Sequence, residues 1–245
     1  MVTASTDREM SLMEHLAELR TRLMIAAGAV LVTTLLSFLF TEQIIKWLLL
    51  PAPAGIKLLA LEPTETFTTY FRVALYSGIA LGMPVILYEI YRYIDPALHP
   101  HERRFVLAMG LPVLALFAVG IAFCYFVVLP SAIRFLYSFG SSVFEPQYRA
   151  SSYLSFVTTF LLAMGLVFEM PAIIYALIRA NVLQRSWLAK QRRYAILVAF
   201  IVGAIITPTP DPFNQTLVSV PLYLLFELGL FLSRFGARPA GARTP

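Results

Sequence analysis

The chain alternates between long uncharged apolar runs and short stretches that carry charge, proline or both. About 20 apolar residues cross a bilayer as a helix, and the runs here show no period of two that would indicate strands of a membrane barrel. The pattern therefore predicts an all-α, polytopic membrane protein with one membrane domain and six spans, at about residues 23–40, 68–88, 105–133, 150–178, 194–207 and 213–233.

The last two predicted spans are short. The run from Tyr194 to Ile206 has 13 residues, or roughly 20 Å of helix, whereas the hydrocarbon core is about 30 Å thick. It ends at the proline-rich segment 207–212. Two interpretations stay open: the bilayer thins or partner helices cover the pair, or interfacial residues extend both helices.

Lysine and arginine are distributed unevenly between the two sides that six spans create. Residues 1–22, 89–104, 179–193 and 234–245 hold 14 of them, and the two loops on the other side hold 5. Because basic residues accumulate on the cytoplasmic side, this bias predicts that both termini lie in the cytoplasm and that the protein sits in the cytoplasmic membrane. Residues 1–22 carry four acids and no apolar core, so they do not predict a cleavable signal peptide.

Composition supports a lipid environment. The chain is 59% hydrophobic and only 13% charged, against about 25% charged in soluble domains, which leaves no room for a separate soluble domain. The net charge of +5 does not indicate a nucleic-acid partner, because the basic residues lie in short stretches between apolar runs, which is the pattern of membrane topology. Cys124 is the single cysteine and lies in an apolar run, where it is expected to act as a small buried hydrophobe.

Two cytoplasmic segments carry the candidate chemistry. The first, residues 10–22, has Ser11 and Glu14 at capping-box spacing and apolar positions at helical spacing, which predicts an amphipathic interfacial helix. Its polar face carries Glu18, for which a simple i,i+4 pair with Arg22 is an alternative to a binding role.

The second segment, residues 93–104, contains two prolines and ends in the sequence His101-Glu102-Arg103-Arg104. Its histidines raise the possibility of a metal site, but a zinc site needs three or four ligands, and the only other histidine is His15. The sequence therefore predicts no metal and no cofactor. It also lacks the nucleophile and metal motifs of hydrolases, so no enzyme activity is expected.

Several motifs recur in one order along the chain. They are H-L-x-E-L-R at 15–20, P-V-I-L-Y-E-I-Y at 84–91 and P-A-L-x-x-H-E-R-R at 96–104, with further segments at 122–130, 153–156, 168–171 and 207–227. Together, from about residue 10 to 235, they resemble the TatC family of the twin-arginine protein-export system. The resemblance implies a concave, glove-like bundle of six helices.

The resemblance also implies a function. TatC proteins bind the paired arginines of export signal peptides at the cytoplasmic face. With TatA- and TatB-type single-span subunits, in a larger complex that also contains further copies of TatC, they move folded proteins across the membrane at the expense of the proton-motive force. The resemblance assigns the twin-arginine site to Glu18 and Glu102, with Arg20, Leu98 and Arg104 shaping it. Arginine fits this assignment because its planar guanidinium offers two parallel donors to a carboxylate, which lysine cannot.

Two acids lie inside predicted spans. Glu169 would cost about 2.5–3.5 kcal/mol within a bilayer, so it is expected to face the interior of the protein or a cavity, unless it reaches the interface. The resemblance places it within the concave face. Glu227 poses the same question, and Arg234, two turns along the same helical face, is its candidate partner.

Thr207 and Gln215 flank the loop between the last two spans. Small polar groups there can hydrogen-bond to a neighbouring helix, and the resemblance places the docking site for partner helices at this edge. Local capping, with Asp211 near the start of the last span, is the equal alternative.

A second function remains in competition. A proton-coupled transporter of a small solute, with Glu169 as its coupling group, would explain six spans and an acid within the membrane. It would not explain the two constrained acidic segments on the cytoplasmic side. The transporter predicts that Glu169 is indispensable, whereas the receptor predicts that binding depends on Glu18 and Glu102.

Overall fold

Helices make up nearly all of the structure. The structure, a computed structural model, describes residues 12–52, 58–94, 100–139, 143, 147–180, 182–207 and 211–236, and at 12, 100–106, 235 and 236 it describes the backbone alone. The elements in chain order are α1 (Leu12–Leu39), α2 (Thr41–Leu49), β1 (Leu58–Leu59), α3 (Glu65–Ile94), α4 (Pro100–Phe123), the π-helical stretch η2 (Cys124–Val128), α5 (Leu129–Ser138), β2 (Tyr148–Arg149), α6 (Ala150–Val167), α7 (Met170–Arg179), α8 (Arg185–Lys190), α9 (Arg192–Ile206) and α10 (Pro212–Gly236).

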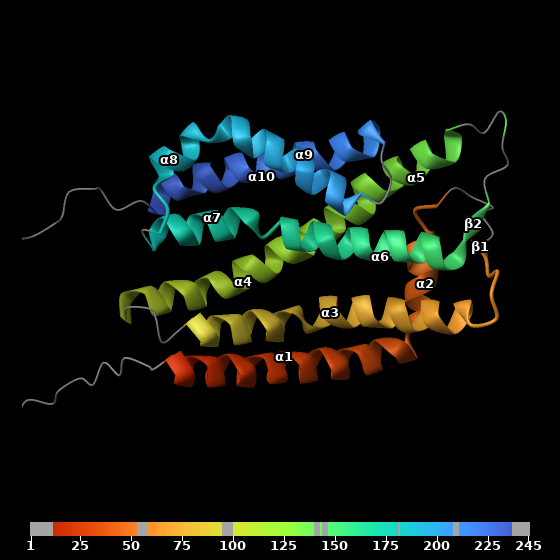
Figure 1. Cartoon of the computed structure of the whole chain (residues 1–245), viewed down its shortest axis with the longest axis horizontal. Helices are drawn as coiled ribbons and strands as arrows, with labels where there is room; N and C mark the ends of the chain where they lie inside the picture. Colours follow the sequence, from red (N-terminus) through yellow and green to blue (C-terminus); the bar gives the residue numbers. More distant parts are fainter. Residues whose placement is uncertain are drawn as a thin grey trace, which may run out of the picture.

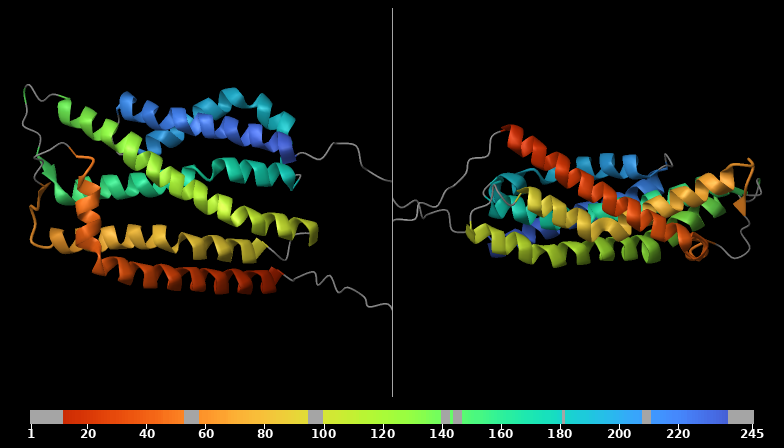
Figure 2. Two further views of the ribbon diagram at one scale, coloured as in Figure 1. Left: turned by 180° about the vertical axis from the view of Figure 1, so that it is seen from behind. Right: turned by 90° about the horizontal axis from the view of Figure 1, so that it is seen from below.

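The long helices lie roughly along the longest axis of the molecule (Figure 1). α1 and α3 lie side by side at one edge, α9 and α10 at the other, and α6 with α7 between them. The chain from α4 through α5 crosses this layer diagonally, as the view from behind also shows (Figure 2). The short α2 runs across the bundle at the end of α1. The bundle therefore has two ends, one with the start of α1 and one with α2 and the strands.

α1 and α3 approach closely because small residues face each other. A Cβ placed on Gly78 would come within 2.6 Å of the Thr34 Cα, so only glycine fits there. The Thr33 hydroxyl donates a hydrogen bond to the Gly78 carbonyl oxygen at 2.7 Å. Small residues and hydroxyls hold helices together in lipid, where apolar burial gives little attraction between them. This contact sets the spacing between the helices that carry Glu18 and Glu89.

One helix continues through a proline by widening a single turn. Leu129 N–H donates to the Cys124 carbonyl oxygen five residues back, and Pro130, which has no N–H, follows directly. As a result α4, η2 and α5 form one apolar rod across the bundle.

Within the part of the chain that the structure describes, five helical segments are long and apolar enough to cross a membrane. They are Met13–Leu39, Glu65–Ile94, Leu107–Ser138, Ala150–Arg179 and Pro212–Arg234, and each overlaps one of the predicted spans. α9 stands where the fifth span was predicted but has 15 residues, about 22 Å of helix, and is not among them. The structure thus shows an all-helical, multi-pass membrane protein, and the count of six spans stays a prediction.

A cluster of fully buried side chains lies around η2, the start of α5 and α6. Cys124, Val128 and Leu129 are fully buried there against Val157 and Phe160. Cys124 carries a free thiol and fills space as a small apolar side chain. By contrast, α1 and α9 expose rows of large apolar side chains, as expected where lipid or a partner helix covers a surface: Leu31, Leu35, Leu39, Leu197, Ile201 and Ile205.

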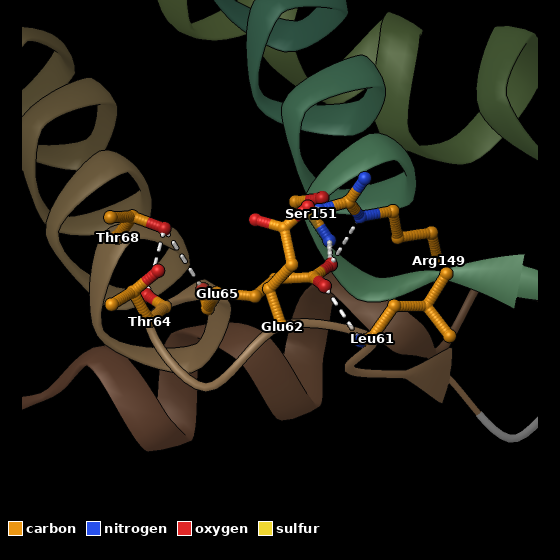
Figure 3. A network of polar contacts seen from close by, with 7 residues as sticks. All are labelled: Leu61, Glu62, Thr64, Glu65, Thr68, Arg149 and Ser151. Carbon is orange, nitrogen blue, oxygen red and sulfur yellow. Dashed lines mark hydrogen bonds and ion pairs between the residues drawn. The ribbon is translucent and has the colours of Figure 1, made fainter.

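A polar cluster joins two loops at the end of the bundle opposite the start of α1 (Figure 3). β1 pairs in parallel with β2, and the buried Glu65 carboxylate accepts the N–H groups of Leu61 at 2.8 Å and Ser151 at 3.0 Å. Arg149 lies 3.1 Å from Glu65 and 2.7 Å from Glu62. Its hydrogen bonds with Glu62 and then Glu65 raise the pKa of Arg149. We call Glu62, Glu65, Arg149 and the two N–H groups the loop clamp.

Candidate functional site

Three helix ends gather where α1 begins: α1 and α4 start there, and α3 ends there (Figure 1). His15 in α1 stacks on Tyr93 in the last turn of α3, with ring centroids 4.5 Å apart. This stack holds the first turns of α1 against the end of α3. The two segments that the sequence marks as cytoplasmic thus belong to the same end of the bundle.

Two acids from different helices share one arginine at this end. Arg22 Nη2 donates to Glu18 Oε1 one turn earlier on α1, and Arg22 Nη1 donates to Glu89 Oε2 on α3, both at 3.2 Å. The side chains of Glu18, Arg22 and Glu89 are 17%, 19% and 8% exposed. We call these three residues the arginine triad. The i,i+4 pair expected from the sequence is therefore present, but it is part of a larger group.

The arginine triad is not fully satisfied. Glu18 Oε2 and Arg22 Nε are both buried and have no hydrogen-bond partner among the described residues. Two carboxylates against one guanidinium leave a formal charge of −1. A buried carboxylate oxygen without a partner carries the cost of desolvation, which a further donor would relieve. The group is therefore suited to accept one more cation.

Of the other predicted site residues, the structure positions only some. Glu102 lies in the first turn of α4 and Arg104 in the next, at the end where the arginine triad lies, and their side chains are not described. Leu98 lies outside the described residues. Arg20 is exposed on α1 and borders a shallow depression with five apolar neighbours, Leu16, Leu19, Leu23, Met24 and Ala27.

Glu169 lies at the break between α6 and α7. The chain leaves the helical path at Phe168 and Glu169, and Pro171 follows in the first turn of α7. The Glu169 side chain is buried, and neither carboxylate oxygen has a hydrogen-bond partner among the described residues. The Glu169 carboxyl is therefore enclosed by the bundle.

Glu227 pairs with a residue other than the one expected. Arg192 at the start of α9 contacts both carboxylate oxygens, with Nε 2.8 Å from Oε1 and Nη2 2.9 Å from Oε2, and the Tyr223 hydroxyl donates to Oε1 at 3.0 Å. Arg234, two turns along the same helix, lies instead over the ring of Phe231. The bidentate contact from a neighbouring helix is the better geometry for a guanidinium.

Thr207 and Gln215 use their donors within the chain. The buried Thr207 hydroxyl donates to the Gly203 carbonyl oxygen at 2.8 Å, and Gln215 Nε2 donates to the Phe200 carbonyl oxygen at 3.0 Å. Asp211 caps α10 by accepting the Asn214 N–H at 2.7 Å. The Asp211 contact is a cap, the Thr207 contact stays within α9, and the Gln215 contact joins the start of α10 to the neighbouring α9.

Sequence reasoning did not single out Glu89, which the structure places against Arg22. It stands in the motif at 84–91, close to the end of an apolar run, and its contact with Arg22 depends on the packing of α3 on α1. An acid so close to an apolar run was the available signal, since a carboxylate there needs a partner.

Comparisons with known proteins agree on one family. The model of the family "Sec-independent protein translocase protein (TatC)" matches residues 14–221. Among similar curated proteins, the TatC protein of Carboxydothermus hydrogenoformans is 37% identical over 94% of this chain and 95% of its own length. The Escherichia coli TatC protein is also 37% identical, over 94% of this chain and 91% of its own.

A solved structure shows the same arrangement of helices. A crystal structure described as the twin arginine translocase receptor TatC superposes with a TM-score of 0.82 at 38% sequence identity. The match covers 92% of this chain and all of that one. The likeness therefore extends over nearly all of the chain.

Proposed function

The chain belongs to the TatC family of Sec-independent protein translocase proteins and is the receptor subunit of a twin-arginine translocase, and on this premise we propose that Glu18 and Glu102 bind the paired arginines of export signal peptides. It is a non-enzymatic component of a transport system. The observation that carries the site proposal is the buried oxygen of Glu18, which has no hydrogen-bond partner among the described residues, at the end of the bundle where α4, the helix that holds Glu102, begins.

Two peptide arginines need two carboxylates on a rigid support. Glu18 is held on α1 by the contact of that helix with α3, and Glu102 stands in the first turn of α4. A guanidinium can give two parallel hydrogen bonds to one carboxylate, whereas an ammonium binds as a point charge. This difference supports selection of Arg-Arg over Lys-Lys. Arg20, Leu98 and Arg104 border the same segments, and we assign them to the shape of the site.

The topology that follows from this proposal has six spans, with α9 as a short fifth one. Both termini and the arginine triad then face the cytoplasm, as the 14 to 5 distribution of basic residues predicts. The loop clamp faces the other side of the cytoplasmic membrane. A helix of about 22 Å reaches across only if the bilayer thins or other helices cover it.

The short edge formed by α9 and α10 is the proposed docking place for TatA- and TatB-type single-span subunits. α9 presents exposed Leu197, Ile201 and Ile205; Thr207 stands at its end, and Gln215 ties the start of α10 to the Phe200 carbonyl oxygen of α9. A partner helix would cover the apolar row, with the polar pair as its anchor. Further copies of the chain would associate in the same larger complex. The complex would then export folded proteins with energy from the proton-motive force.

Glu169 is the intramembrane polar group of this proposal. Its buried carboxyl at the break between α6 and α7, which has no hydrogen-bond partner among the described residues, would face the path of the cargo when the bundle opens. That path lies within the membrane, where an acid without a partner is tolerated only for a function.

The decisive experiment is binding of labelled signal peptides to the detergent-purified protein. The wild type is expected to bind an Arg-Arg peptide saturably and at least roughly tenfold more tightly than the Lys-Lys peptide, because only guanidinium binds both oxygens of a carboxylate. Glu18→Ala and Glu102→Ala are each expected to weaken binding of the Arg-Arg peptide by roughly tenfold or more.

Glu42→Ala provides the matched control, since Glu42 is an exposed acid on α2 at the opposite end of the bundle. Its binding should equal that of the wild type. Binding that ignores the arginines, or that survives in both the Glu18 and Glu102 variants, would remove the site assignment.

A further inference from the structure

We infer that Glu89 is a positioning residue of the signal-peptide site and that Arg22 is the resident cation of that site, which one of the two peptide arginines displaces from Glu18. In the empty protein Arg22 bridges Glu18 and Glu89; in the occupied protein it stays on Glu89 alone. This inference rests on the proposed function, and it adds a residue on α3 and an exchange of partners to it.

The contacts of Arg22 are those of a replaceable partner. Each carboxylate receives a single hydrogen bond of 3.2 Å, longer than the 2.7–2.9 Å usual for charged pairs, and neither is bound bidentately. Arg22 Nε and Glu18 Oε2 are left without partners among the described residues. A peptide arginine can offer Glu18 both of its parallel donors at once, which Arg22, bridging two helices, cannot.

Glu89 makes this exchange possible. A guanidinium expelled from a partly buried site would need a new partner, since a buried charge left alone is strongly unfavourable. Glu89, on α3, is the most buried member of the triad and already holds Arg22 Nη1. Arg22 can therefore release Glu18 and remain paired. The Glu89–Arg22 pair is then neutral, and Glu18 pairs with the peptide arginine.

Counting charges predicts the effect of each substitution. The wild-type triad carries −1 and attracts one cation. Glu89→Gln leaves Arg22 wholly to Glu18, the charge becomes zero, and peptide binding weakens although Glu89 does not touch the peptide. Arg22→Gln removes the competitor, the charge becomes −2, and binding tightens. The double variant Arg22→Gln/Glu89→Gln returns to −1 with Glu18 free.

The test measures the Kd of the labelled Arg-Arg peptide for the full-length protein in detergent. Glu89→Gln is expected to weaken binding by roughly 5–10-fold and Arg22→Gln to tighten it by a similar factor. The double variant should bind within about twofold of the wild type or more tightly. Rescue of one substitution by the other is not expected if Glu89 only stabilises the fold.

Two control variants change the same charges elsewhere. Glu42→Gln and Lys46→Gln break an exposed i,i+4 pair on α2, at the opposite end of the bundle. Both should leave the Kd unchanged. The salt dependence of binding should steepen in Arg22→Gln and flatten in Glu89→Gln, because screening acts on the net charge of the site.

Several results would overturn the inference. Weakened binding in Arg22→Gln, or a double variant weaker than Glu89→Gln, would show that Arg22 supports the site and does not compete for it. Should Glu89→Gln fail to fold, Arg22→Gln decides alone: tighter binding supports the exchange and unchanged binding refutes it.

A different set of results would overturn the proposed function itself. If the wild type ignores the arginines, or Glu18→Ala binds as the wild type does, both proposals fall. If Glu18→Ala weakens binding while the Arg22 and Glu89 variants have no effect, only the exchange is lost.

Discussion

The two ends of the bundle each place one arginine between two acids, and they differ in what surrounds it. In the loop clamp, Arg149 meets Glu62 and Glu65; in the arginine triad, Arg22 meets Glu18 and Glu89. Each group carries a formal charge of −1. Charge alone therefore does not separate a structural cluster from a binding site.

The difference lies in the backbone donors. Both oxygens of Glu65 accept N–H groups, from Leu61 and Ser151, so its carboxylate is satisfied on both sides (Figure 3). In the arginine triad one oxygen of Glu18 accepts nothing from the described residues. A carboxylate that the backbone completes holds loops together, and one that the backbone leaves incomplete retains capacity for a ligand.

The largest effect is expected from Glu65→Ala, which removes the central carboxylate of the loop clamp. The change leaves two N–H groups and Arg149 without their shared acceptor and frees the pairing of β1 with β2. The thermal unfolding midpoint in detergent is expected to fall by roughly 5 °C or more. Affinity for the signal peptide at a temperature where the variant stays folded should not change, because the loop clamp lies at the other end.

Glu62→Gln is its matched control, since the Glu62 side chain is 62% exposed and contacts the same arginine. It should shift the midpoint by only about 1 °C. Equal falls in the unfolding midpoint of Glu62→Gln and Glu65→Ala would mean that the two backbone hydrogen bonds to Glu65 do not contribute to stability.

A smaller effect is expected from Gly78→Ala, which acts on the spacing of α1 and α3. The added methyl group would overlap the backbone of Thr34, so the helices must move apart, and Glu89 moves away from Arg22 with them. We expect peptide affinity to fall by roughly 3–10-fold, with a drop in the unfolding midpoint of a few degrees.

Gly28→Ala on α1 serves as the control, because a Cβ there meets nothing within 4 Å. It should leave both quantities unchanged or raise the midpoint slightly, as alanine favours helix. Tight peptide binding in Gly78→Ala would show that the triad does not depend on helix spacing.

The sequence predicted the elements that repeat a simple pattern. Apolar runs gave the five long segments, and local spacing gave the Glu18–Arg22 pair. What it could not give were contacts between distant segments: Glu89 on Arg22, Arg192 on Glu227, and β1 on β2. These contacts depend on which helix faces pack together. Helices in lipid associate through small residues and polar groups, and these residues do not recur at regular intervals in the sequence.

The features that the sequence analysis did not predict are short: the helix α2 and the break between α6 and α7. α2 has nine residues between a span and a loop, too few for a periodic signal, and its pattern merges with the preceding apolar run. The break at Phe168 and Glu169 has a clearer origin, because Pro171 marks it in the sequence, although a proline alone does not tell a kink from an interruption.

The smallest effect is expected from an exposed ion pair, which extends the comparison to a pair at the surface. On α2 the Lys46 ammonium lies 2.6 Å from Glu42, with both side chains more than 60% exposed, and this hydrogen bond lowers the pKa of Glu42 below its usual value. A carboxyl whose pKa is lowered by folding stabilises the fold above its unfolded pKa of about 4.5 and loses that contribution as the pH falls through the folded value.

The unfolding midpoint of Glu42→Gln should therefore lie within about 1 °C of the wild type at pH 7, and the remaining difference should shrink as the pH falls below about 4.5. Lys46→Gln should behave alike, since either change removes the same pair. A difference of several degrees that persists in acid would mean that α2 depends on Glu42 in some other way. If neither variant changes the unfolding midpoint, this exposed pair contributes less than either cluster. Of the three arrangements, only the two that bury carboxylates between helices or loops would then affect stability or binding.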